Sequence, residues 1–136
     1  MNMTINILAV LVAAVVSMVV GSLWYGPVFG KMWKGLMGFT DESMKSMKMS
    51  MMQAMVGGFI TALVMAYVLA RFAIISGAMG VMGAFNLAFW IWLGFTATVA
   101  AGGFLWEGKP FKLFLLNAAE QLVALFLMAL VLVFWQ

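Results

Sequence analysis

Four long apolar segments make up most of this 136-residue chain, and charged residues are only 8% of it. Soluble domains have roughly a quarter of their residues charged. So few charges cannot cover the apolar surface of a water-soluble fold, and lipid is therefore the expected solvent. A spanning helix needs about 20 mostly apolar residues. We predict one all-α integral membrane domain, residues 1–136, with four transmembrane helices at about 5–25, 52–75, 85–106 and 112–135.

Composition argues against several classes of function. The chain has no cysteine and no histidine, so disulfides and most zinc or haem ligands are missing. The net charge of +3 lies in loops and forms no basic face for nucleic acid. No paired carboxylates and no nucleophile with a base are found. We therefore expect no enzyme, no metal, no cofactor and no nucleic-acid partner, but contact with membrane lipids.

Loop charges predict an orientation. Every lysine lies in or next to residues 26–51 and 107–111, whereas the other side of the membrane holds only Arg71. The positive-inside rule then places the first and third loops in the cytoplasm and both termini outside. The first apolar segment lacks the positive start of a signal peptide and is too long, so we expect a spanning helix there. Aromatic residues at helix ends are interpreted as interface anchors: Trp24, Tyr25 and Trp106.

Residues 40–55 predict a short surface helix in the first loop that runs into the second span. Thr40 or Asp41 is the expected cap. Four methionines recur at spacings of three and four and share one face: Met44, Met47, Met51 and Met55. Thioethers bind cuprous copper, but no histidine or cysteine supports a metal. We favour a flexible apolar stripe against lipid or protein.

The first and third spans end on the same pattern, G-x-L-W-x-G, at residues 21–26 and 103–108. The final glycine allows a left-handed turn, and the prolines that follow, Pro27 and Pro110, do not continue a helix cheaply. Two interpretations stay open. The chain consists of two parallel helix-pair repeats, or the match is a coincidence of residues that are common at helix ends.

Small residues at every fourth position predict where helices touch, because hydrophobicity does not drive association in lipid and close backbone approach does. Three stripes are found: Ala9, Ala13, Ser17 and Gly21; Gly58, Ala62, Ala66 and Ala70; Gly94, Thr98 and Gly102. The fourth segment has no such stripe. We therefore predict that the first three helices form the tight interior, with one stripe available for a homodimer.

Glu120 is the acidic residue placed well inside a predicted span, where a charge costs about 2.5–3.5 kcal/mol. Asn117 and Gln121 share its helix face. The candidate proton or cation site is Glu120, Asn117, Gln121 and Asn86. One interpretation is a small carrier, with Trp90 and Trp92 available to an organic cation. The other is a neutral Glu120 that bonds across the bundle or stays wet near the interface.

The motifs resemble a known family. Residues 23–31 read LWYGPVFGK and are followed by Trp33, and later stretches read WLGF at 92–95, WEG at 106–108 and LFLLNA at 113–118. Together they resemble the bacterial membrane proteins called domain of unknown function 1761. The resemblance implies a four-helix protein of a bacterial cytoplasmic membrane, with no established activity and no catalytic residues.

Two functional hypotheses therefore stay open. The first is a small carrier or channel with a buried carboxyl. The second is a structural accessory subunit that docks onto a larger membrane complex, and either form is expected to be oligomeric. In the family pattern an aromatic residue occupies the position of Glu120, which weakens the carrier hypothesis.

Overall fold

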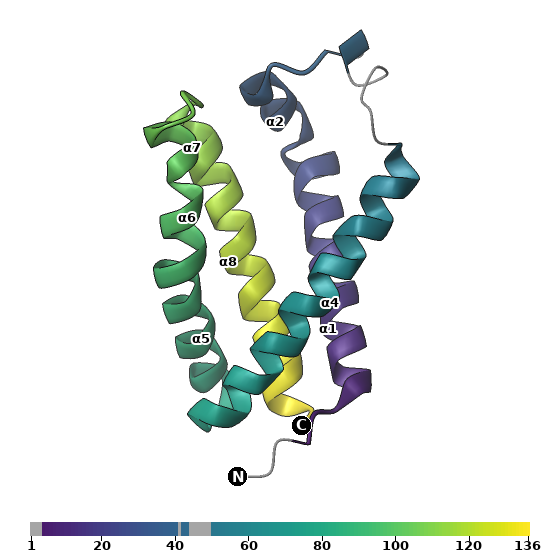
Figure 1. Cartoon of the computed structure of the whole chain (residues 1–136), viewed down its shortest axis with the longest axis vertical. Coiled ribbons are helices and arrows are strands. Elements are labelled where there is room, and N and C mark those ends of the chain that lie inside the picture. The colour runs from purple at the N-terminus through teal and green to yellow at the C-terminus, as the bar shows by residue number, and fades with distance from the viewer. Residues whose placement is uncertain (1–3, 41, 44–49) are drawn as a thin grey trace.

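The computed structural model describes residues 4–40, 42–43 and 50–136, and every element within them is a helix (Figure 1). Four stretches are long and apolar enough to cross a membrane: Ile7–Val28, Met51–Ser76, Gly80–Leu105 and Phe111–Phe134. The prediction of an all-α chain with four candidate spans is confirmed. The third stretch begins five residues before the predicted boundary at 85, because the turn after Ser76 is shorter than expected.

The elements follow one another with short connections. In chain order they are α1 (Ile7–Leu23), the π-helix η1 (Trp24–Val28), α2 (Gly30–Met37), α4 (Met51–Ser76), α5 (Gly80–Ile91), the π-helix η2 (Trp92–Ala97), α6 (Thr98–Ala100), α7 (Gly102–Leu105) and α8 (Phe111–Phe134).

Local hydrogen bonds explain where the helices start. The Asn6 side chain accepts a bond from the backbone N–H of Ala9 at the start of α1. At the start of α4, Ser50 and Gln53 form a reciprocal capping box. Ser50 is in extended conformation, with φ −69° and ψ 161°. The predicted continuous helix from residue 40 into the second span is therefore wrong, because the chain is extended immediately before Met51.

The first loop nevertheless contains helix. Glu42 and Ser43 are helical, and the Thr40 hydroxyl accepts a bond from the backbone N–H of Ser43, as the predicted cap would. Asp41 and residues 44–49 lie outside the described residues, and with them two of the four stripe methionines, Met44 and Met47. Sequence reasoning missed α2, which ends at Gly38 with a left-handed φ of 73°.

The shared pattern at the ends of the first and third spans has two different structures. Gly108 has a φ of 70° and makes the expected left-handed turn. Gly26 does not, and the first span continues through Pro27 as a π-helix to Val28. The wider π turn, in which the N–H of Phe29 bonds the carbonyl of Trp24, accommodates the proline that an α-helix would reject. The local structure therefore gives no sign of a repeat at these motifs.

Helix α8 lies between the other spans and contacts α1, α4 and α5 (Figure 1). It has the largest buried share of the four candidate spans. The prediction that the first three helices form the interior is therefore wrong. The fourth segment has no small stripe because it provides large side chains, chiefly Leu125, Met128 and Leu132, that fill the space left by small residues on its neighbours.

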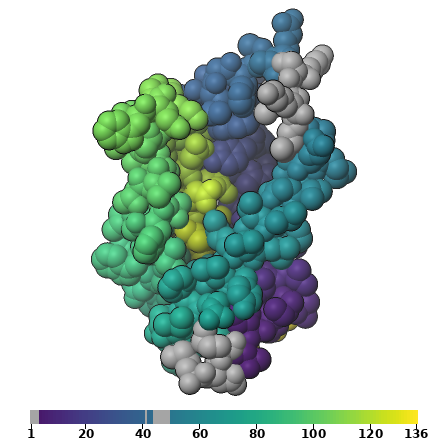
Figure 2. Space-filling model, viewed as in Figure 1, coloured from purple at the N-terminus to yellow at the C-terminus, as the bar shows by residue number. Residues whose placement is uncertain are grey.

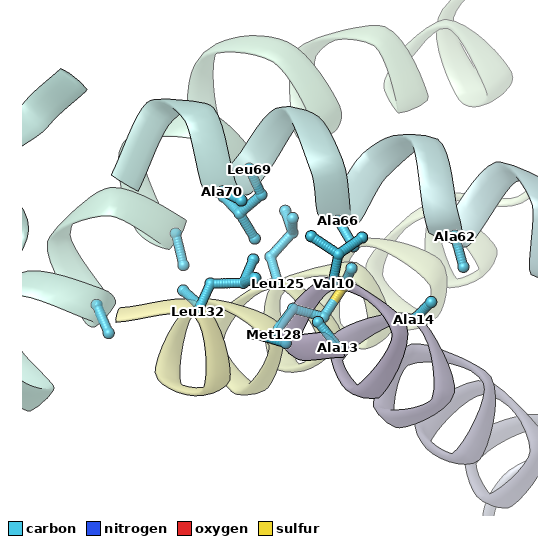
Figure 3. Packing of buried hydrophobic residues seen from close by; sticks show 14 residues of the cluster. Val10, Ala13, Ala14, Ala62, Ala66, Leu69, Ala70, Leu125, Met128 and Leu132 are labelled. Atoms are coloured by element: carbon cyan, nitrogen blue, oxygen red, sulfur yellow. The ribbon is translucent and has the colours of Figure 1, made fainter. Parts of the chain in front are cut away.

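The small residues of α1 and α4 form that space (Figure 3). Ala9, Ala13, Ala62, Ala66 and Ala70 are all buried. Ser17, Gly21 and Gly58 continue the stripes and are half-buried, and a Cβ on Gly58 would touch the Met18 side chain at 3.6 Å.

The third stripe does not line a helix contact. Gly94 and Thr98 are exposed, and Gly102 is half-buried. The π-helix at Trp92–Ala97 rotates the helix surface out of the α-helical register that the stripe assumes. Instead Ala84 and Ala88, each 0% exposed, bring α5 against α8.

The two ends of the molecule differ. The described termini meet at one end, where the Asn6 amide donates a bond to the Trp135 carbonyl at 3.3 Å. Helix α2 and the turn after α7 lie at the opposite end, called here the loop end, and there the helices diverge (Figure 1).

A buried alanine of α8 tests this packing. Ala129 is 0% exposed, so Ala129→Leu should overpack the core and lower the free energy of unfolding by about 1–3 kcal/mol. The matched control is Ala119→Leu, at an exposed position on the same helix. Unfolding in detergent, followed by circular dichroism, measures both. Equal stability of the two variants would contradict the central place of α8.

Candidate functional site

The diverging helices leave a groove at the loop end. Two cavities of about 440 Å³ and about 570 Å³ are both lined by Trp33, Val99, Ala100 and Asn117, so they share a wall. Figure 2 shows the hollow between the green segment of α5 to α7 and the blue-purple segment of α1 and α2. We call these joined cavities the loop-end groove. Its remaining polar lining residues are Tyr25, Thr96, Glu107, Lys109 and Gln121.

A hydrogen bond crosses the molecule at this groove. The Tyr25 hydroxyl donates to Oδ1 of Asn117 at 2.7 Å, which joins the end of the first span to α8. Both side chains are half-buried. Tyr25 is therefore more than the interface anchor that the sequence predicts, because its hydroxyl bonds inside the bundle. Asn117 and Gln121, two of the four predicted site residues, line the groove from α8.

The other two predicted anchors differ from Tyr25 and from each other. Trp106 is 87% exposed at the end of the third span, as an anchor would be. Trp24 is half-buried, and its indole nitrogen is buried with no hydrogen-bond partner among the described residues. A buried donor without an acceptor is costly.

Both π-helices contribute to the groove. Tyr25 comes from η1, and Phe95 and Thr96 come from η2. Single π turns are frequent at functional sites, because they turn side chains out of the regular helical register. Sequence reasoning missed both. Pro27 inside an apolar run was the available signal for η1, whereas η2 has no proline.

Glu120 lies beside the groove and is not among its lining residues. It is 5% exposed, and its Oε1 is 3.7 Å from the point that a Cβ on Gly21 would occupy. Within the described part of the chain no group donates a hydrogen bond to its carboxyl. Gly21, predicted as a packing residue, therefore also provides the space beside this carboxyl.

Asn86 does not join the other three predicted site residues. It is exposed and lines a separate cavity of about 430 Å³ with Ser76, Gly77 and Trp90, near the turn between α4 and α5. That turn lies at the opposite end of the molecule from the loop end (Figure 1). Asn86 lies on α5 and Asn117 on α8, so no helical spacing relates the two.

The predicted aromatic site for an organic cation is also not formed. Trp90 is 64% exposed and lines the Asn86 cavity, whereas the Trp92 indole donates to the Ala118 carbonyl at 2.8 Å. Residues two apart on a helix do not face the same way, so the two rings do not enclose one ligand.

These features define the class of the protein. It is a small all-helical chain with four candidate membrane spans, closely packed at the end where the termini meet and hollowed by a groove at the other. The chain belongs to the family described as Protein of unknown function (DUF1761), whose sequence model matches residues 8–133. The resemblance inferred from the motifs is thereby confirmed over nearly the whole chain. No curated protein and no solved structure matches it.

The Tyr25–Asn117 bond is open to a direct test. A double-mutant cycle of Tyr25→Phe and Asn117→Ala should give a coupling energy of about 0.6 kcal/mol, because hydrogen bonds between helices in membranes are modest. The matched control is Tyr67→Phe, whose exposed hydroxyl meets only Arg71, at 3.5 Å. Unfolding in mixed micelles measures each variant. Additive effects of the two substitutions would show that the bond does not join the helices.

Proposed function

We propose that this protein is a small, non-enzymatic membrane carrier or channel that binds its cargo in the loop-end groove, with Glu120 as the proton or cation site beside it. The observation that supports this most is the state of Glu120. The residue is only 5% exposed within a candidate span, and the described residues supply its carboxyl with no hydrogen-bond donor. An ionisable group inside a span is costly and is most simply explained by function.

The position of Glu120 connects it to the groove. It follows Asn117 by three residues and precedes Gln121 by one, and both of these line the groove. Tyr25, whose hydroxyl donates to Asn117, lines the same groove. A proton or cation that leaves Glu120 therefore meets a set of neutral polar side chains before it reaches open space. Neutral hydroxyls and amides suit such a path because they both donate and accept hydrogen bonds.

The setting we propose is a bacterial cytoplasmic membrane, with the first and third loops inside. The distribution of lysine and arginine supports this orientation. Helix α2, with Lys31 and Lys34, and the turn after α7, with Lys109, lie at the loop end, and the described termini lie at the other end (Figure 1). The groove would then open toward the cytoplasm.

A second candidate function is a structural accessory subunit or homo-oligomer. A second groove, of about 590 Å³, lies between α1 and α4 and favours this role. Its lining is apolar apart from one serine: Val15, Met18, Val19, Ser22, Leu23, Met55, Val56, Phe59 and Ile60. Such a surface is suited to an apolar helix from another subunit of a membrane complex.

Proton movement tests the carrier proposal. Purified protein is placed in liposomes that hold a pH-sensitive dye, and a potassium diffusion potential drives protons inward. The wild-type protein should raise the proton flux above that of empty liposomes, and Glu120→Gln should lower that added flux by about tenfold or more, because the amide does not exchange a proton. Glu42→Gln, the same change at an exposed site, is the control.

The same purified protein distinguishes the carrier from the accessory subunit. A wild-type flux equal to that of empty liposomes, or an undiminished flux in Glu120→Gln, would contradict the carrier. A larger assembly after purification in mild detergent, together with no flux, would favour the accessory subunit. A single monodisperse monomer would count against that second role.

Single cysteines test the orientation, because the chain has none of its own. Met79→Cys, at a residue that is 83% exposed between α4 and α5, should react with a membrane-impermeant maleimide in right-side-out vesicles. Glu42→Cys, in the first loop, should react only in inside-out vesicles. The reverse pattern would contradict the positive-inside assignment.

A further inference from the structure

The mouth of the loop-end groove holds two opposite charges above one glycine. A Cβ on Gly103 of α7 would lie 3.7 Å from Oε2 of Glu107 and 4.0 Å from Cδ of Lys109. Both side chains therefore lie over the same short piece of backbone. They line the cavity of about 440 Å³ together with Trp33 and Trp106.

In the part of the chain that the structure describes, Glu107 and Lys109 form no ion pair. A carboxylate and an ammonium that share a cavity without bonding to each other are placed to bind the two ends of a zwitterion. Lysine is a common partner of phosphate, and a carboxylate beside tryptophan rings suits an ammonium group.

The walls of the groove add an apolar requirement. Phe95 and Val99 line the groove and are 73% and 76% exposed, and both lie within the candidate span Gly80–Leu105. In a membrane this side of the groove faces hydrocarbon. A ligand that satisfies both the charged mouth and this wall has a zwitterionic head and an apolar tail.

We propose that the loop-end groove binds a phospholipid with a zwitterionic headgroup, such as phosphatidylethanolamine. Lys109 contacts the phosphate, Glu107 contacts the ammonium group, and the acyl chains follow Phe95 and Val99. The cavity lies within the range of about 300–1,000 Å³ that ligand pockets occupy. The assignment rests on the proposed function in one respect, since it names the class of cargo that the same groove would hold.

Lipid retention tests the assignment. The protein is reconstituted in equal mixtures of phosphatidylethanolamine, phosphatidylglycerol and diacylglycerol, extracted in mild detergent, and weighed by native mass spectrometry. Phosphatidylethanolamine should be retained over each of the other two lipids. The double variant Glu107→Gln, Lys109→Gln, which keeps the size of both side chains close to the original, should lower that preference by about tenfold.

A matched control and a second variant exclude a folding defect. Glu42→Gln with Lys31→Gln removes the same charges at exposed positions outside the groove and should keep the preference. Gly103→Leu fills the space below Glu107 and Lys109 and should abolish the preference, whereas Gly35→Leu, at a site with nothing within 4 Å of its Cβ position, should not.

Three results would overturn the assignment. They are equal retention of all three lipids, an unchanged preference in the double variant, and full displacement of the lipid by soluble glycerophosphoethanolamine, which would mean that the headgroup alone is the ligand. Selective retention without any Glu120-dependent proton flux would support this lipid site and reject the carrier. Flux without selective retention would do the reverse.

Discussion

The packing of α8 into the space between α1 and α4 determines the rest of this structure. Alanines on α1 and α4 let the two backbones approach, and Leu125 and Met128 of α8 fill the space that those alanines leave. In lipid this close fit of small against large residues replaces the hydrophobic effect as the source of helix association. The result is a closely packed end near the termini (Figure 3).

Toward the loop end the residues at the contact between these helices become polar. Ser17 and Gly21 follow the alanines on α1, and Glu120 and Asn117 take the place of leucine and methionine on α8. Polar groups need hydrogen-bond partners and specific distances, so they do not pack as closely as interlocking apolar side chains. The hydrogen bond between Tyr25 and Asn117 lies where the helices separate. The loop-end groove forms where the facing surfaces of α1 and α8 change from apolar to polar residues.

Much of the fold was predictable because hydropathy alone identifies spanning helices. The central position of α8 was not predictable from the small-residue stripes. Such stripes identify the helix faces that leave space at a contact, but not the helix whose large side chains fill that space. The π-helices were missed, although Pro27 inside an apolar run was a signal for η1; η2 contains no proline and had no such signal. Pro27 and Gly26 normally end a helix, but the wider π turn, with its bond from the Phe29 N–H to the Trp24 carbonyl, accommodates them.

The candidate site was predictable in part. Asn117, Glu120 and Gln121 share one helix, so their spacing placed them together, although only the two amides line the groove. Tyr25 and Asn117 are 92 residues apart, and no short-range pattern relates them. Asn86 was grouped with the site because it is an amide in an apolar segment. The residue type alone did not show that Asn86 lies at the opposite end of the molecule.

The polar groups near the groove differ with their distance from the start of α8. A helix rises about 1.5 Å per residue, so from Phe111 the chain reaches Asn117 after about 9 Å and Glu120 after about 14 Å. The charged pair Glu107 and Lys109 precedes the helix, the amides follow, and the buried carboxyl comes last. The polar side chains thus run from full charge in the exposed loop, through neutral hydrogen-bonding groups, to one isolated carboxyl in the apolar bundle. The loop charges are exposed to water, and the amides of α8 line the groove. Glu120 alone of these groups is an ionisable side chain in apolar surroundings, and it is therefore the residue that requires a functional explanation.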